Sequence, residues 1–144
     1  MSHLIDGAAN LTPRVEVLPA TGHTPGDVMV LVADADVLFA GDLCFFGVTP
    51  LAFQGDPQQW ANVLDAIVEL ADTIVPGHGP VGGEREVRDL QQYLRHCVDG
   101  TIPPGPWDYW SEREPRDAIN IERAALLRDK LDEIPPSMLK AIGL

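Results

Sequence analysis

Basic residues, cysteines and long apolar runs are all scarce in this chain of 144 residues. Ten Lys and Arg stand against 22 Asp and Glu, which gives a formal net charge of −12. A surface this acidic argues against nucleic acid or an anionic membrane as a partner, and simple solubility accounts for the charge. No stretch approaches the roughly 20 consecutive apolar residues that cross a bilayer. We therefore expect neither nucleic acid nor a membrane among the partners.

The two cysteines, Cys44 and Cys97, make neither a disulfide framework nor a C-x-x-C motif. The N-terminal residues show no basic segment followed by an apolar one, which is the pattern of a secretory signal. A cytoplasmic location is therefore expected. Hydrophobic residues make up 45% of the chain, enough for one domain with a sizeable core.

Short apolar runs in the first half of the chain predict a sheet. Residues 28–33 and 37–40 are continuous apolar runs, rich in β-branched residues and joined by the turn 34–36. They predict a hairpin that is buried on both faces. Residues 14–18 and 73–75 predict two shorter strands.

Helical patterns occupy the second half. Asp56 and Pro57 are typical of a helix start, with aspartate at the N-cap and proline at the first helical position. Further helices are expected over 84–98 and 116–133. The inner face expected for the last of these comprises Ala124, Leu127, Leu131 and Ile134. The order of elements predicts an α+β fold with helices on one face of a sheet.

Three loops framed by glycine and proline each carry one potential metal ligand. They are Gly22-His23-Thr24-Pro25-Gly26-Asp27, Gly41-Asp42-Leu43 and Pro76-Gly77-His78-Gly79-Pro80. Taken singly, His23 and His78 are more simply loop histidines, and Asp42 a turn-capping aspartate. Taken together, two imidazoles and a carboxylate beside strand ends favour a metal site or its remnant, with zinc, iron or manganese as the metal.

These loops occur in an order that resembles the C-terminal half of the metallo-β-lactamase superfamily. Gly-His-Thr-Pro-Gly is followed by the hairpin, Leu-Phe-Ala-Gly-Asp-Leu, a helix, a strand and Val-Pro-Gly-His-Gly-Pro, over about residues 14–99. By this resemblance, His23 completes one metal site, Asp42 bridges two metals and His78 serves the second. Residues 45–50 and the second histidine loop are most similar to the branch that contains hydroxyacylglutathione hydrolases and cyclase-like proteins.

The first metal motif of that family, His-x-His-x-Asp-His, is absent from this sequence. His3 is the only histidine upstream of His23 and has no such context, while His96 lies within a predicted helix. Without the motif, two metals would have one histidine each and a shared aspartate, too few ligands for tight zinc binding. We name no catalytic residue in this chain.

The resemblance implies half of an αββα sandwich, with a mixed sheet and helices on one face. The second layer could be a second copy of the chain, a separate N-terminal half, or C-terminal helices folded back over the sheet. An uncovered apolar face would promote aggregation, so we expect a homodimer or a complex with an N-terminal half. The expected divisions are an N-terminal arm at 1–13, the half-domain at 14–100, and a Pro-rich connector with C-terminal helices at 101–144.

Three functional hypotheses follow. The first is a metal-dependent hydrolase of an ester, thioester, lactone or amide, incomplete in this chain. The second is a non-catalytic half-domain that binds or assembles with a partner. The third is a fragment of a longer enzyme. Cys44 and the aromatic residues Trp107, Tyr109 and Trp110 are more simply packing residues than ligands or a substrate pocket.

Overall fold

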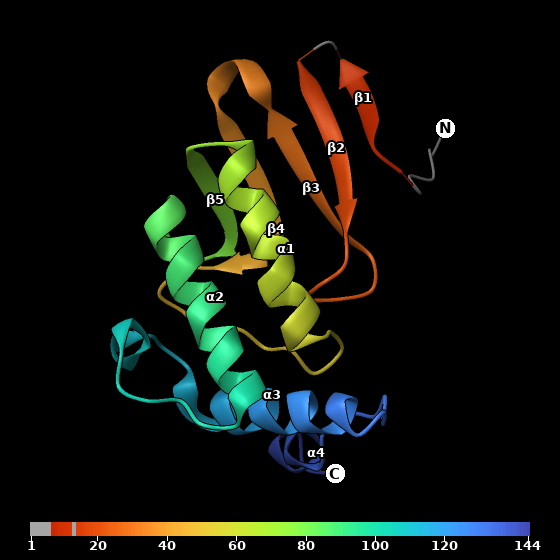
Figure 1. Ribbon diagram of the computed structural model, residues 1–144, viewed down its shortest axis with the longest axis vertical. Helices are drawn as coiled ribbons and strands as arrows, with labels where there is room; N and C mark the ends of the chain where they lie inside the picture. The colour runs from red at the N-terminus through yellow and green to blue at the C-terminus, as the bar shows by residue number, and fades with distance from the viewer. Residues whose placement is uncertain (1–6, 13) are drawn as a thin grey trace.

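The computed structural model describes residues 7–12 and 14–144, which form one mixed sheet with helices beside it (Figure 1). The sheet has five strands that neighbour one another in chain order. The first four are antiparallel, and the fifth runs parallel to the fourth. The strands are β1 (Ala9–Thr12), β2 (Val15–Ala20), β3 (Asp27–Val32), β4 (Val37–Phe45) and β5 (Thr73–His78).

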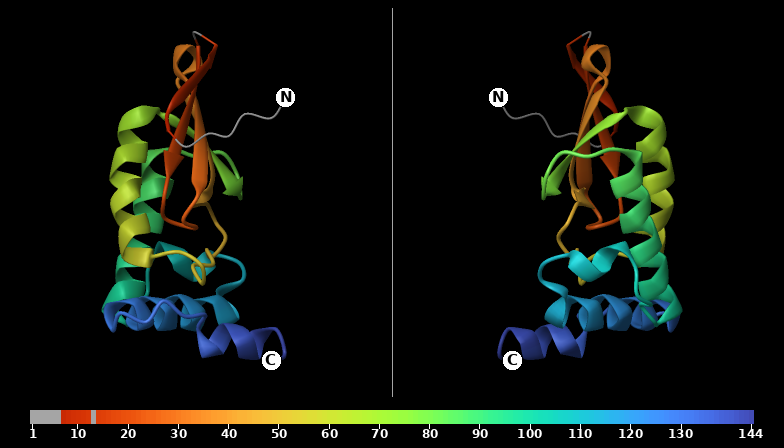
Figure 2. Two further views of the ribbon diagram at one scale, coloured as in Figure 1. Left: turned by 90° about the vertical axis from the view of Figure 1, so that its right-hand side faces the viewer. Right: turned by 90° about the vertical axis from the view of Figure 1, so that its left-hand side faces the viewer.

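Two long helices cover one face of this sheet, as expected. They are α1 (Pro57–Leu70) and α2 (Glu84–Asp99), and Figure 2 shows both on the same side of the strands. The later helices α3 (Arg113–Arg128) and α4 (Pro136–Ala141) lie across one end of the sheet, with α3 packed on α1 and α2. Two short 3-10 turns, η1 (Ala33–Ala35) and η2 (Pro106–Tyr109), complete the chain.

The locally encoded predictions are confirmed. The Asp56 side chain accepts hydrogen bonds from the backbone N–H groups of Gln58 and Gln59, so the predicted N-cap starts α1. The predicted hairpin forms between β3 and β4. Cys44 and Cys97 are buried and unpaired as core residues. Of the aromatic residues expected to pack, Trp107 is buried at the edge of the core, but Tyr109 is 94% exposed, so the expectation is wrong for Tyr109.

The expected burial of the hairpin on both faces is wrong within this chain. Met29 and Leu38 face α1 and α2 and are buried, but 47% of Phe39 is exposed on the opposite side. Alternate residues of β3 and β4 form this uncovered surface, here called the open face: Val28, Val30, Val32, Val37 and Phe39. Helices α3 and α4 do not fold back over it, so that alternative is excluded (Figure 2).

The expected N-terminal arm includes a strand. Residues Ala9–Thr12 form β1 and pair with β2, for example Ala9 with Val17. This pairing satisfies backbone groups along what would otherwise be an exposed edge of β2. Residues 1–6 and 13 lie outside the described part of the chain.

The third predicted helix is displaced, and its buried face is confirmed only in part. It ends at Arg128 rather than at residue 133, because Lys130 has a left-handed backbone (φ 62°) that stops the helix. Ala124 is buried as predicted, but Leu131 and Ile134 lie beyond the end of the helix and are exposed. Asn120 and Arg123, which the prediction did not include, are buried. Pro135 and Pro136 begin α4, which suits the preference of proline for a first helical turn.

No helix within residues 7–12 and 14–144 is both long and apolar enough to span a bilayer.

Candidate metal centre

The three predicted ligands meet at one edge of the sheet. Strands β2, β4 and β5 run in the same direction, so their carboxyl ends lie together. His23 lies in the loop after β2, Asp42 lies in the last part of β4, and His78 ends β5. Three loops that are far apart in the sequence therefore converge because of the strand order.

Asp42 stands between the two histidines and offers one oxygen to each. Its Oδ2 lies 3.7 Å from Nε2 of His23, and its Oδ1 lies 3.4 Å from Nε2 of His78. Both imidazoles thus turn the same ring nitrogen toward one carboxylate. These separations are longer than hydrogen bonds of good geometry.

Aromatic side chains fix the two imidazole rings. His23 packs edge-on against Trp60, with ring centroids 5.1 Å apart, and only 16% of its side chain is exposed. His78 stacks on Phe45 at 4.5 Å with an interplanar angle of 14°, and Phe45 also contacts His23 at 5.6 Å. Phe45 therefore contacts both predicted ligands, a supporting role that the sequence pattern did not reveal.

Asp27 is a second supporting residue that sequence reasoning missed. Its carboxylate accepts hydrogen bonds from the backbone N–H groups of Gly22 and Thr24 and from the Thr24 hydroxyl, at 2.7 to 3.1 Å. These bonds close the loop around His23. Asp27 lies in the same glycine- and proline-framed loop as His23, but its bonds run back to Gly22 and Thr24 rather than forward as in the usual aspartate turn.

Close backbone approach explains the glycine in the His78 loop. A Cβ placed on Gly77 would lie 2.2 Å from Oδ1 of Asp42 and 2.8 Å from the Gly41 carbonyl oxygen. Any larger residue would displace the carboxylate. Gly77 therefore lets β5 bring His78 beside Asp42.

Burial keeps His23 in the form that binds metals. Loss of water around the ring lowers the pKa of His23, and the negative charges of Asp42 and Asp27 offset this only in part. Its Nδ1 is buried and makes no hydrogen bond within normal limits, although the Leu51 backbone is near enough to favour the protonated ring slightly. A neutral imidazole at neutral pH is ready to bind a cation without first releasing a proton.

The donor set and its spacing fit a divalent metal. Two ligands of one tetrahedral zinc, each about 2.1 Å from the ion, lie about 3.4 Å apart. The two contacts of Asp42 are 3.4 and 3.7 Å, so each histidine could share one ion with one carboxylate oxygen. Among the described residues, however, no three His, Cys, Asp or Glu side chains form a group that could hold one metal ion. This chain supplies two ligands to each possible ion.

The outer side of this centre is accessible. About half of the Asp42 and His78 side chains is exposed, at 48% and 52%. Phe45 and Trp60, by contrast, are buried and close off the inner side. Additional ligands could therefore approach only from the outer side.

Sequence relatives agree with this geometry. The chain is 39% identical over 66 residues to a hydroxyacylglutathione hydrolase of Shewanella baltica (strain OS185), an overlap of 45% of this chain and 24% of that protein. It is 34% identical over 100 residues to the probable metallo-hydrolase YqgX of Bacillus subtilis, an overlap of 64% and 47%. The chain thus spans between a quarter and a half of the length of these relatives.

Solved structures share the fold. The DIM-1 metallo-beta-lactamase superposes with a TM-score of 0.58 at 20% identity, over 65% of this chain and 48% of that one. The FIM-1 enzyme of Pseudomonas aeruginosa, in a mono-zinc form, gives a TM-score of 0.56 at 19% identity, over 72% and 47%. The five-stranded sheet with its helices therefore corresponds to about half of a metallo-β-lactamase structure.

The family model described as "Metallo-beta-lactamase superfamily" matches residues 2–78, which include all three candidate ligands. The match covers more than half of the chain. The chain belongs to the metallo-beta-lactamase superfamily.

Proposed function

We propose that this chain contributes one half of a metal-dependent hydrolase site that acts on an ester, thioester, lactone or amide. The observation that carries the proposal is the position of Asp42, which turns one oxygen toward each of two histidines. Such a carboxylate is suited to bridge two cations. The relatives, named as hydrolases, support the same class of reaction.

His23, Asp42 and His78 would hold the metal, with the carboxylate shared. A bound divalent cation polarises a carbonyl oxygen and provides hydroxide near neutral pH. The chain prepares for this by keeping His23 neutral and by excluding water from its inner side with Phe45 and Trp60. Asp42 and His78 are each about half exposed and so accessible to a small substrate.

The proposed site is completed by a second polypeptide layer over the open face. Each ion would have only two ligands from this chain, whereas catalytic zinc sites use three protein ligands. A layer against Phe39 and its neighbours would both bury the apolar surface and bring further ligands to the outer side. We propose either an N-terminal half that carries the missing histidine motif or a second copy of the chain.

A zinc titration of paired variants tests the proposal. The double variant His23→Ala/His78→Ala should lose zinc binding, and His96→Ala is the matched control because His96 packs against Trp107, away from the candidate ligands. Isothermal titration should show binding to the wild type and the control but not to the double variant. Equal zinc uptake by all three proteins would refute the site.

The second candidate function is a non-catalytic assembly module. It is favoured because no three side chains among the described residues could together hold one metal ion. Under this alternative the open face would still bind its partner, but the assembled complex would take up no zinc. Metal analysis of the complex therefore separates the two functions.

A further inference from the structure

One face of α3 is polar and binds the backbone of the segment between β4 and α1. Arg116, Asn120 and Arg123 lie at positions i, i+4 and i+7, which places them on the same side of the helix. Arg116 donates to the Thr49 carbonyl at 2.7 Å, and Asn120 donates to Pro50 at 2.8 Å. Asn120 also accepts from the Ala52 N–H at 2.8 Å. Arg123 donates to the Gly55 carbonyl at 2.9 Å.

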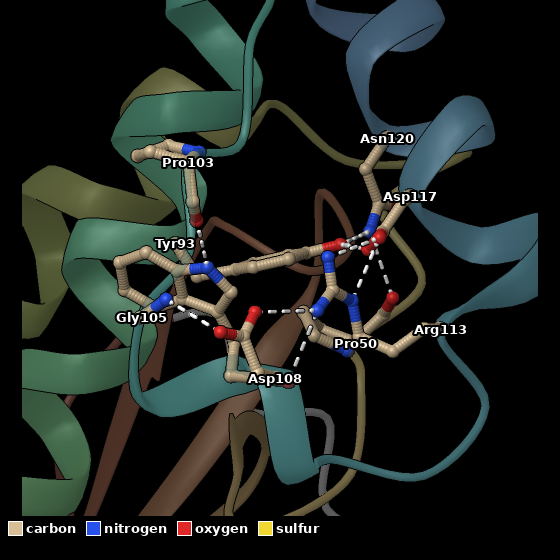
Figure 3. Close-up of polar contacts among 9 residues, drawn as sticks. Pro50, Tyr93, Pro103, Gly105, Asp108, Arg113, Asp117 and Asn120 are labelled. Atoms are coloured by element: carbon tan, nitrogen blue, oxygen red, sulfur yellow. Dashed lines mark hydrogen bonds and ion pairs between the residues drawn. The ribbon is translucent and has the colours of Figure 1, made fainter.

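Side-chain hydrogen bonds also join this polar face of α3 to α2. The Asn120 side chain also donates to the hydroxyl of Tyr93 on α2, which in turn donates to Asp117 at 2.6 Å (Figure 3). Arg113 completes the cluster by donating to the same carboxylate at 2.7 Å. The position of α3 relative to α2 is therefore fixed by hydrogen bonds as well as by packing.

Arg123 is the member of this face that requires an explanation. Only 5% of it is exposed, and burying a guanidinium is costly unless its donors are satisfied. Besides Gly55, it donates to the Glu133 carbonyl at 2.6 Å and to Asp132 at 2.7 Å. It thus joins the segment after α3 to the turn before α1.

The peptide group held by Arg123 also contacts the His23 loop. The oxygen of the Gly55–Asp56 peptide accepts from Arg123, and the N–H of the same peptide donates to the Gly22 carbonyl at 3.1 Å. The packing is tight, since a Cβ on Gly55 would lie 2.1 Å from the Gly22 oxygen and 2.5 Å from the His23 oxygen. A charged donor at one end of a peptide fixes its plane and strengthens the N–H at the other end.

We infer that Arg123 is a positioning residue for His23, acting from α3 through the Gly55–Asp56 peptide onto the loop that presents the imidazole. The C-terminal helices are thereby part of the metal site although none of their side chains reaches it. The predicted effect on metal binding rests on the proposed function, whereas the positioning of the His23 loop by Arg123 does not.

The test compares two arginines on the same helix. Arg123→Met removes the donor to Gly55, and Arg116→Met removes an equivalent donor to Thr49, which has no contact with the His23 loop among the hydrogen bonds described above. Amide hydrogen exchange is followed at Asp56, whose N–H binds Gly22, with Leu64 in the middle of α1 as internal reference. Zinc affinity is measured on the same samples, and urea unfolding reports global stability.

Arg123→Met should accelerate exchange at Asp56 about tenfold relative to Leu64 and weaken zinc binding about tenfold. Arg116→Met should change either quantity by less than about threefold. Unchanged exchange at Asp56 in Arg123→Met, or an equal change in both variants, would overturn the inference. If Arg123→Met does not fold, Arg123→Lys and Arg116→Lys give the same comparison with one charged donor retained.

The two proposals fail separately. If the wild type binds no zinc, the metal site is refuted. If Asp56 nevertheless exchanges faster in Arg123→Met, the positioning role of Arg123 on the His23 loop is supported. The opposite result is also possible: zinc binding disappears in the histidine double variant, while Arg123→Met keeps both its zinc affinity and its Asp56 exchange rate. That result would support the metal site and refute the positioning role of Arg123.

Discussion

Asp42 and its immediate neighbours show how single residues set this site. The carboxylate is held between His23 and His78 by β4, while Gly77 leaves the space that its Oδ1 occupies. Phe45 and Trp60 hold the rings, and Asp27 closes the loop. Each of these residues acts within a few ångströms, so single substitutions should have local and separable effects.

Gly77→Ala should disable the centre. Its new methyl group would occupy the position 2.2 Å from Oδ1 of Asp42 and displace the carboxylate. We expect zinc affinity to fall at least about tenfold and stability to fall by about 1–3 kcal/mol. Zinc titration and urea unfolding measure the two effects.

Gly26→Ala is the control for this substitution. It lies in the His23 loop, but a Cβ there would meet no atom within 4 Å. Its zinc affinity should match that of the wild type. If both alanine variants bind zinc equally well, close approach at Gly77 does not matter to the site.

Among the helices and strands, features encoded by neighbouring residues were predicted correctly, whereas features set by tertiary contacts were not. The hairpin and the Asp56 cap are encoded within a few residues, and both are present. The inner face of α3 was predicted only in part: Ala124 is buried as expected, but hydrophobic periodicity does not report buried polar residues such as Asn120 and Arg123. Their partners are backbone carbonyls about 70 residues away, and no local pattern reports them.

The start of α2 gives a test at this scale. Glu86 accepts a hydrogen bond from the Gly83 N–H at 2.9 Å, and this bond is the main cause that lowers the pKa of Glu86. Because the folded pKa lies below the unfolded value, the stabilisation is present above pH 4.5 and is lost as the pH falls through the folded pKa.

Glu86→Gln should therefore be less sensitive to acid than the wild type. At pH 7 it should be slightly less stable, by under about 1 kcal/mol, and this difference should shrink below pH 4. Urea unfolding at several pH values measures both. A constant difference between the two proteins across this range would show that the Glu86 charge has no role in capping α2.

For the whole molecule, the open face is the main feature that differs from the sequence prediction. The continuous apolar runs predicted burial on both sides, and the structure covers one side with α1 and α2. The other side leaves Val28 and Phe39 exposed. Under the proposed function, one additional layer would cover this apolar surface and supply further metal ligands.

Phe39→Lys should disrupt assembly without unfolding the chain. The charge would lie at the centre of the open face, where 47% of the phenylalanine is exposed. Light scattering should show the wild type as a defined oligomer or complex and Phe39→Lys as a monomer. Tyr109→Lys, at a 94% exposed position of the 3-10 turn η2, is the control and should assemble normally. Identical masses for all three proteins would exclude the open face as the interface.

The most direct measurement is a crystal structure of the protein soaked in zinc, with anomalous diffraction recorded at the zinc absorption edge. The account predicts zinc at about 2.1 Å from Nε2 of His23 or of His78, with an Asp42 oxygen on the same ion. Zinc bound elsewhere, for example at His96, with no density between Asp42 and either histidine, would contradict it.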